Sequence, residues 1–246
     1  MIRADNACLG QRLGPVSLYI RAGDCWHILG ENGAGKSSLL QVLAGLETVT
    51  GGVVLWQGRP VDEVGLSFLA GQRAWHDQQH VIGFEIPVHQ YLSFYADTEL
   101  PAQISQALEL AHLMHRPVTQ LSGGEQQRVN LARAFLQVWP ALQRGQACLI
   151  LDEPLQSLDV RHQYSLLMLL QTFNEAGNTL ILSSHDLSLS ARFAGQAALM
   201  SAGQIIASGD KHTVFQADLL ARTFGIQFAI NNNQNALQIT PVWPTV

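Results

Sequence analysis

Charged residues and cysteines are both scarce in this sequence. Only 13% of its 246 residues carry a charge and 47% are hydrophobic, which predicts a globular protein with one domain or two closely joined lobes. The formal net charge is −5 and no cluster of Lys and Arg occurs, so a nucleic-acid partner is disfavoured. The three cysteines are too few, and odd in number, to indicate a disulfide framework.

Long hydrophobic runs are absent as well. Tight apolar stretches such as residues 147–151 are far shorter than the ~18 to 20 residues that cross a bilayer as a helix. The first five residues, MIRAD, contain nothing like the apolar segment of a signal peptide. We therefore expect the chain to remain in the cytosol.

What the sequence does contain is a phosphate-loop pattern, G-x-x-x-x-G-K-[ST]. Its defining positions are Gly30, Gly35, Lys36 and Ser37. A strand-like apolar run at 25–29 precedes the loop, and a helical pattern at 36–44 follows it. In this context the loop points backbone N–H groups and a helix N-terminus at one anion. The chain is therefore predicted to bind a nucleoside triphosphate and Mg²⁺.

Two carboxylates follow another apolar strand. Residues 147–151 run directly into Asp152 and Glu153. Because the carboxyl ends of parallel strands face the ligand, we expect both acids beside the phosphate loop. Asp152 would hold Mg²⁺, mostly through water, together with the Ser37 hydroxyl, and Glu153 would act as general base toward the attacking water. For two acids taken alone, a solvated turn is an equal alternative.

A third segment, residues 121–128 with the sequence LSGGEQQR, begins a further helix. Ser122 and Glu125 have the spacing of a capping box, which predicts a helix N-terminus here. Gly123 and Gly124 let backbone N–H groups approach an anion, so this is a second candidate phosphate-binding helix end. A plain capped helix would explain the box but not the pair of glycines.

Periodicity outlines the rest of the chain. Strands are predicted at 16–20, 53–57, 147–151 and 179–183, and a short apolar element near 64–69. Helical spacing dominates from about 88 to 138. The last part is predicted to hold a strand pair around 202–203, a helix at 213–224 and a hairpin turning at 231–235.

Together these segments resemble the nucleotide-binding subunits of ABC transporters over nearly the whole chain. The phosphate loop is similar to that family's Walker A loop, residues 148–154 to its Walker B strand, and residues 121–128 to its signature motif. Residues 157–159 are similar to its D-loop, and residues 183–186 to the segment with its switch histidine.

The resemblance implies an α/β fold of the P-loop NTPase type. We expect a mixed sheet core with an antiparallel β subdomain at 1–84 and 139–246, and an inserted helical subdomain at 85–138. It also implies ATP and Mg²⁺ as ligands, and a head-to-tail dimer in which the Walker A loop of one copy and the signature helix of the other enclose each ATP.

The resemblance also implies roles for single residues. Catalysis is assigned to Glu153, His185 and a loop glutamine, for which Gln78 is favoured over Gln79 by its spacing. The metal set is Ser37, Gln78 and Asp152. The nucleotide-binding set is Gly30, Asn32, Gly33, Ala34, Gly35, Lys36, Ser37, Ser38, Ser122, Gly123, Gly124, Gln126 and Asp159. Since residues 1–18 contain no aromatic side chain to stack on adenine, Arg12 or Leu13 would lie nearest to the base.

The partners implied are a second copy of the chain, two transmembrane permease subunits that dock near residues 80–91, and indirectly a periplasmic substrate-binding protein. This places the chain on the cytoplasmic face of a bacterial inner membrane. Within the family, the sequence is most similar to the ATPase subunits of vitamin B12 importers, with iron-siderophore or haem importers as the alternative. A soluble ABC ATPase of DNA repair or translation is disfavoured, because it would need a basic surface.

Overall fold

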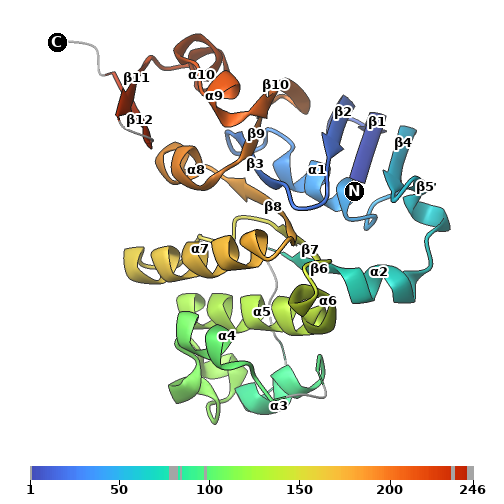
Figure 1. The fold of residues 1–246 in the computed structure, drawn as a ribbon, viewed down its shortest axis with the longest axis vertical. Helices are drawn as coiled ribbons and strands as arrows, with labels where there is room; N and C mark the ends of the chain where they lie inside the picture. Colours follow the sequence, from blue (N-terminus) through green and yellow to red (C-terminus); the bar gives the residue numbers. More distant parts are fainter. Residues whose placement is uncertain (1, 78–82, 84, 97–98, 234–235, 243–246) are drawn as a thin grey trace. The chain divides into compact units, whose positions relative to one another are not determined.

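The computed structural model describes residues 2–77, 83, 85–96, 99–233 and 236–242. The chain forms two compact units, which are described separately. The first joins Met1–Gly65 to Ile181–Val246, and the second is Leu66–Leu180 (Figure 1). In the described part of the chain, no helix is both long enough and apolar enough to cross a membrane.

The first unit contains an antiparallel sheet in the order β2-β1-β4-β5. Its strands are β1 (Ile2–Leu9), β2 (Leu13–Ile20), β4 (Gly51–Trp56) and β5 (Arg59–Pro60). In β2 the side chains of Val16, Leu18 and Ile20 are buried, whereas Ser17 and Tyr19 are exposed. This alternation confirms the strand predicted at 16–20 and turns one face of the sheet toward the core.

A second group of strands in this unit follows the order β10-β9-β3-β8. They are β3 (Cys25–Gly30), β8 (Thr179–Ser184), β9 (Gln196–Ser201) and β10 (Gln204–Asp210). β3 and β9 are parallel, whereas β9 and β10 are antiparallel, so the sheet is mixed. The last residue of β3, Gly30, leads directly into the phosphate loop.

Helices and a hairpin complete the first unit. They are α1 (Lys36–Leu43), the short 3₁₀ turn η1 (Val61–Glu63), α8 (Leu187–Phe193), α9 (Lys211–Val214), α10 (Ala217–Phe224), and the hairpin of β11 (Phe228–Asn233) and β12 (Ala236–Pro241). Leu39, Leu40 and Leu43 of α1 are buried, which confirms the helix predicted after the phosphate loop. The terminal hairpin is confirmed too, although residues 234 and 235 of its turn lie outside the described residues.

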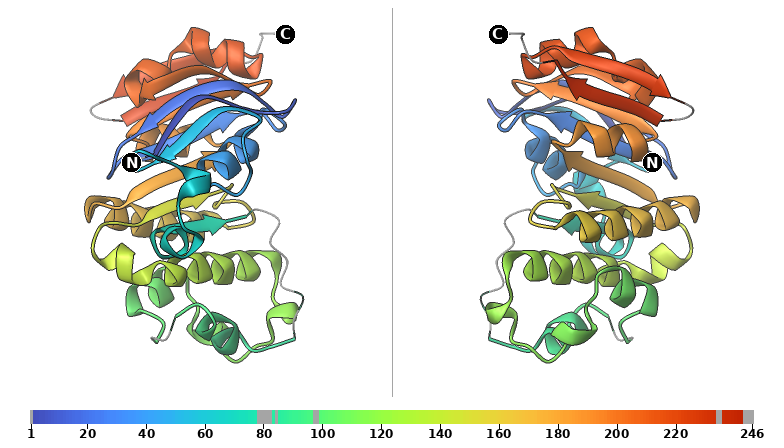
Figure 2. Two further views of the ribbon diagram at one scale, coloured as in Figure 1. Left: turned by 90° about the vertical axis from the view of Figure 1, so that its right-hand side faces the viewer. Right: turned by 90° about the vertical axis from the view of Figure 1, so that its left-hand side faces the viewer.

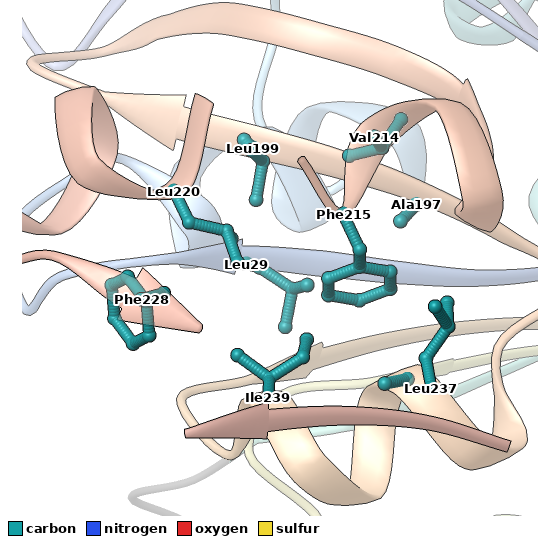
Figure 3. Close-up of a cluster of buried hydrophobic side chains, with 10 residues drawn as sticks. Leu29, Ala197, Leu199, Val214, Phe215, Leu220, Phe228, Leu237 and Ile239 are labelled. Atoms are coloured by element: carbon teal, nitrogen blue, oxygen red, sulfur yellow. The ribbon is translucent and has the colours of Figure 1, made fainter. Parts of the chain in front are cut away.

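The single helix predicted at 213–224 is wrong, because the chain forms α9 and α10 with a break between them. At the break, Phe215 leaves the helical region with φ −79° and ψ 70°. Its ring is buried in a cluster with Leu29, Leu237 and Ile239 (Figure 3). Burial of an aromatic ring in this core outweighs the cost of interrupting a helix whose spacing looked continuous.

The second unit combines a strand pair with helices. Its elements are α2 (Leu66–Gln72), β6 (Arg73–His76), α3 (Val88–Ser93), α4 (Ala102–Ala107), the 3₁₀ turns η2 (Ala111–Leu113) and η3 (Val118–Gln120), α5 (Gly123–Gln137), α6 (Trp139–Gln143), β7 (Cys148–Leu151) and α7 (Val160–Glu175). β6 and β7 are parallel. Figure 2 gives two views of these helices, of which α3 packs on α5 and α4 on α7.

Two predictions can be compared with this unit. The helical region expected from about 88 to 138 is confirmed by α3, α4 and α5, while its definition as a separate subdomain at 85–138 stays a prediction. The apolar element expected near 64–69 is α2, but only Leu69 of this helix is buried. Leu66 is 79% exposed, so apolar character there did not indicate a core position.

Candidate functional site

The phosphate loop of the first unit forms the expected strand, loop and helix arrangement. Gly35 is the N-cap residue of α1 and has a φ of +97°, a left-handed conformation that L side chains rarely adopt. A Cβ atom at Gly35 would also lie 3.1 Å from the carbonyl oxygen of Arg12. Glycine is therefore required at this position by both conformation and space.

The N-terminus of α1 is open to a ligand. Its N-cap provides no side-chain hydrogen bond, and no acidic residue occurs in its first turn. The Lys36 ammonium is buried against the loop and donates to the carbonyl oxygens of Gly30 at 3.0 Å and Glu31 at 3.2 Å. Uncapped N–H groups beside an ammonium form a cradle that fits phosphate groups, and the Ser37 hydroxyl on the first turn is a ligand type that Mg²⁺ accepts.

The remaining loop residues are arranged around this helix end. Asn32 and Gly33 are exposed at the tip, whereas Ser37 and Ser38 are half-buried on the first turn of α1. The carbonyl oxygen of Ala34 accepts from the backbone N–H of Gly203 at 3.0 Å, which ties the loop to the turn between β9 and β10.

The two candidates for adenine contact differ in exposure. Leu13 is fully buried, so it has no surface to offer a base and that alternative is wrong. Arg12 lies beside the loop, with its side chain 56% exposed and its Nη2 donating to Glu47 Oε1 at 3.0 Å. Of the pair, only Arg12 can stack on a base.

His185 is held between the end of β8 and the start of α8. Ser184 Oγ accepts from the backbone N–H of Asp186, and Asp186 caps α8 by accepting from the N–H of Leu189 at 2.9 Å. α8 is attached to β3 by a 3.0 Å hydrogen bond between His27 Nδ1 and Ser190 Oγ. Burial lowers the pKa of His27 to about 4, so this ring stays neutral, whereas His185 is exposed.

In the second unit, Asp152 and Glu153 directly follow β7. These two residues are only 3% and 7% exposed, which is rare for carboxylates unless they are paired or serve a site. Glu153 has a φ of +45°, a conformation that costs free energy for any residue other than glycine. The expected meeting of these acids with the phosphate loop joins two units that the structure describes separately, and it stays a prediction.

The signature segment forms the predicted capping box at the start of α5. Ser122 N–H donates to Glu125 Oε2 at 2.7 Å, and Glu125 N–H donates to Ser122 Oγ at 3.4 Å. The hydrogen bond from the Ser122 backbone lowers the pKa of Glu125, with a further contribution from Arg116. Gln126 points its Nε2 at the carbonyl oxygen of Leu121, while Ser122 and Gly123 are exposed.

The signature helix contacts the loops that follow Walker B. Gln127 Nε2 donates to the carbonyl oxygen of Pro154 at 3.1 Å. A Cβ atom at Gly124 would lie 2.7 Å from the carbonyl oxygen of Ser157, so the helix reaches the D-loop backbone closely. Asp159 caps α7, accepting from the backbone N–H of His162, and this bond together with the His162 ring lowers the pKa of Asp159.

A family model supplies the decisive comparison. The model described as "ABC transporter" matches residues 13–156, which is more than half of the chain. The chain belongs to the ABC transporter family.

Named relatives of this ABC family member extend over almost its full length. The vitamin B12 import ATP-binding protein BtuD of Yersinia pseudotuberculosis is 37% identical, covering 98% of each chain. The protein of the same name from Escherichia coli O139:H28 is 39% identical over 88% of each. An ATP-binding cassette solved as a dimer in a post-hydrolysis state, bound to ADP and Pi, has a TM-score of 0.70 at 23% identity and covers 86% of this chain and 99% of that one. The predicted ABC-type α/β fold is thereby confirmed.

Some site residues could not be placed, and others were missed. Gln78 and Gln79 lie outside the described residues, so the choice between them stays a prediction. Gln127 was not singled out from the sequence, although its spacing of three from Gly124 puts both on the face of α5 that meets the Walker B and D-loop backbone. That spacing was the available signal, but the loops it contacts are distant in sequence.

Proposed function

We propose that this chain is the ATP-binding and ATP-hydrolysing subunit of a vitamin B12 importer. The observation that carries the proposal is 37% identity to a B12 import ATP-binding protein over 98% of both chains. Its physical support is that the residues needed for both halves of an ATP site are present, an open phosphate loop in one unit and buried acids beside a capped signature helix in the other.

The site is proposed to be completed by a second copy. Ser122 and Gly123 of the signature segment are exposed rather than packed in the core of their own unit. A related cassette was solved as a dimer. In a head-to-tail pair, each phosphate loop would meet the partner's Ser122, Gly123, Gly124 and Gln126. Asp159 would lie at the same junction, where its exposed carboxylate can contact the other copy.

The residues would then divide the work. Lys36 and the N–H groups of α1 hold the phosphates, and Ser37, Asp152 and Gln78 would hold Mg²⁺, which supplies charge neutralisation on the phosphate oxygens. Glu153 accepts the proton of the attacking water as the water oxygen bonds the γ-phosphorus and the bond to the ADP oxygen breaks. His185 orients the γ-phosphate by donating a hydrogen bond.

The base assignment is tested by Glu153→Gln. The amide keeps the shape of the side chain but cannot accept a proton, so we expect hydrolysis to fall by about 100-fold or more while ATP affinity stays within about twofold. The ATP-bound variant should accumulate as a dimer in size-exclusion chromatography. Glu175→Gln, an exposed acid of α7, is the matched control and should hydrolyse ATP normally. Normal turnover in Glu153→Gln would refute the assignment.

The transported substrate requires its own test. The two permease subunits, an indirect periplasmic substrate-binding protein and a position at the cytoplasmic face of the inner membrane all follow from the importer proposal. Deleting the gene for this chain should abolish uptake of radiolabelled vitamin B12 and leave uptake of iron-siderophores and haem intact. Loss of iron or haem uptake with normal B12 uptake would instead select the alternative importer.

A further inference from the structure

A histidine on the first turn of α7 lies between two carboxylates. His162 Nδ1 is 2.9 Å from Asp159 Oδ1, and its Nε2 is 3.4 Å from Glu109 Oε2. The His162 side chain is 16% exposed, while Glu109 is half-covered and also forms an ion pair with Arg161. The family match assigns no role to His162 or Glu109.

The two ring nitrogens of His162 meet the two carboxylates in different ways. Ionised carboxylates only accept hydrogen bonds, so Nδ1 must donate to Asp159. Among the described residues Nε2 has no hydrogen-bond partner, and this buried nitrogen lies in contact with Glu109 Oε2 at 3.4 Å. The cations near the same carboxylates are Arg161, paired with Glu109, and Arg128, whose charge acts on Glu109 and Asp159.

The segment that carries Glu109 is fixed to the signature helix. Arg128 of α5 is buried, and its Nη1 donates to the carbonyl oxygens of Leu108 at 2.6 Å and Glu109 at 3.1 Å. Glu109 itself has a φ of +47°, which turns the chain out of α4. Displacing Arg128 would leave two carbonyl groups and a buried guanidinium without these bonds, so the segment and α5 form one rigid connection.

We propose that His162 is a positioning residue that joins the D-loop to the signature helix. Its Nδ1 binds Asp159 while its ring lies against Glu109, the residue that Arg128 attaches to α5. The signature motif and Asp159 would then keep a fixed position relative to each other when they meet the second copy. This inference rests on the proposed ATPase function and concerns a contact that would influence the rate of ATP hydrolysis.

The test compares His162→Ala and His162→Gln with the native chain in steady-state ATP hydrolysis. Because His162 is not among the residues assigned to bind ATP or Mg²⁺, we expect kcat to fall by about tenfold in His162→Ala while the KM for ATP changes less than about twofold. His162→Gln keeps a donor for Asp159 and should recover part of the rate. His112→Gln, an exposed histidine of the same unit, is the matched control and should match the native rate.

Energetic coupling between His162 and Glu109 separates positioning from simple structural support. In a double-mutant cycle with Glu109→Gln, the two losses should be less than additive, because either change breaks the same contact. Thermal unfolding of each variant identifies any that fail to fold, and His162→Gln retains the test if His162→Ala does.

The outcomes distinguish this inference from the function on which it rests. If the native chain hydrolyses ATP but His162→Gln recovers none of the rate and the two losses add, the positioning role is overturned. If the native chain itself neither binds nor hydrolyses ATP, the proposed function fails, whatever the variants do.

Discussion

Two helix N-termini in this chain, those of α1 and α5, are built in opposite ways. At α1 no side chain caps the first N–H groups, and the Lys36 ammonium is bonded to the carbonyl oxygen of Gly30 in the loop. At α5, Ser122 and Glu125 satisfy each other's backbone N–H groups and place a carboxylate on the first turn. An open N-terminus with a cation can hold an anion by itself, whereas a capped one with its own negative charge is a poorer anion site alone.

Under the proposed function, this difference predicts that the first site holds phosphate in a single copy and that the second contributes only in a dimer. The first turn of α1 has no side-chain cap and lies beside the Lys36 ammonium, so its N–H groups can donate to an incoming phosphate. The N-terminus of α5 is already capped without a ligand. The N–H groups of its glycines would therefore form only one side of a phosphate site. Nucleotide bound by one copy is therefore expected to bring the phosphate to the signature helix of the other.

The comparison is tested most strongly by Lys36→Ala. Removing the ammonium takes away a cation that lies on the phosphate loop, so ATP affinity of the isolated monomer should fall by about 100-fold or more. Binding is measured by isothermal titration. Lys211→Ala, which removes an equal charge from a half-buried position in α9 outside the phosphate loop, should bind ATP as the native chain does. Native affinity in Lys36→Ala would show that the backbone N–H groups suffice.

An intermediate effect is expected from Gly124→Ala. The added Cβ would lie 2.7 Å from the carbonyl oxygen of Ser157, a backbone atom that cannot rotate away. We expect the free energy of unfolding to fall by about 1 to 3 kcal/mol, as for other overpacked sites. Gly123→Ala is the matched control, since a Cβ there has open space and should leave stability unchanged or slightly raised. Equal stability of the two variants in urea unfolding would exclude the close contact.

The smallest effect is expected from Ser122→Ala. Loss of the N-cap hydroxyl should lower the free energy of unfolding by about 1 kcal/mol, the usual cost for a cap of this kind. ATP binding to the monomer should not change, because α1 makes that contact, while hydrolysis by the dimer should decline. A loss of monomer affinity in titration would contradict the division between the two helix ends.

Local motifs account for the parts that the sequence predicted well. The phosphate loop, the capping box and the acids after β7 depend on hydrogen bonds and spacings within a few residues, so they can be read directly from the chain. Sequence reasoning failed where burial decided the outcome. The ring of Phe215 is buried in the core, and the helix predicted through it is interrupted there. Leu13 is buried rather than open to a base, and Leu66 is exposed although its side chain is apolar.

By itself the sequence determined that this protein has a phosphate loop, a capped signature helix and a strand ending in two acids. Only the tertiary structure decided which helix end stays open, which face of α5 meets the D-loop, and that His162 lies between Asp159 and Glu109. The physical reason is distance along the chain. Glu109 and His162 are far apart in sequence, and no local propensity brings them together without the packing of α4 on α7 and the anchoring of Arg128.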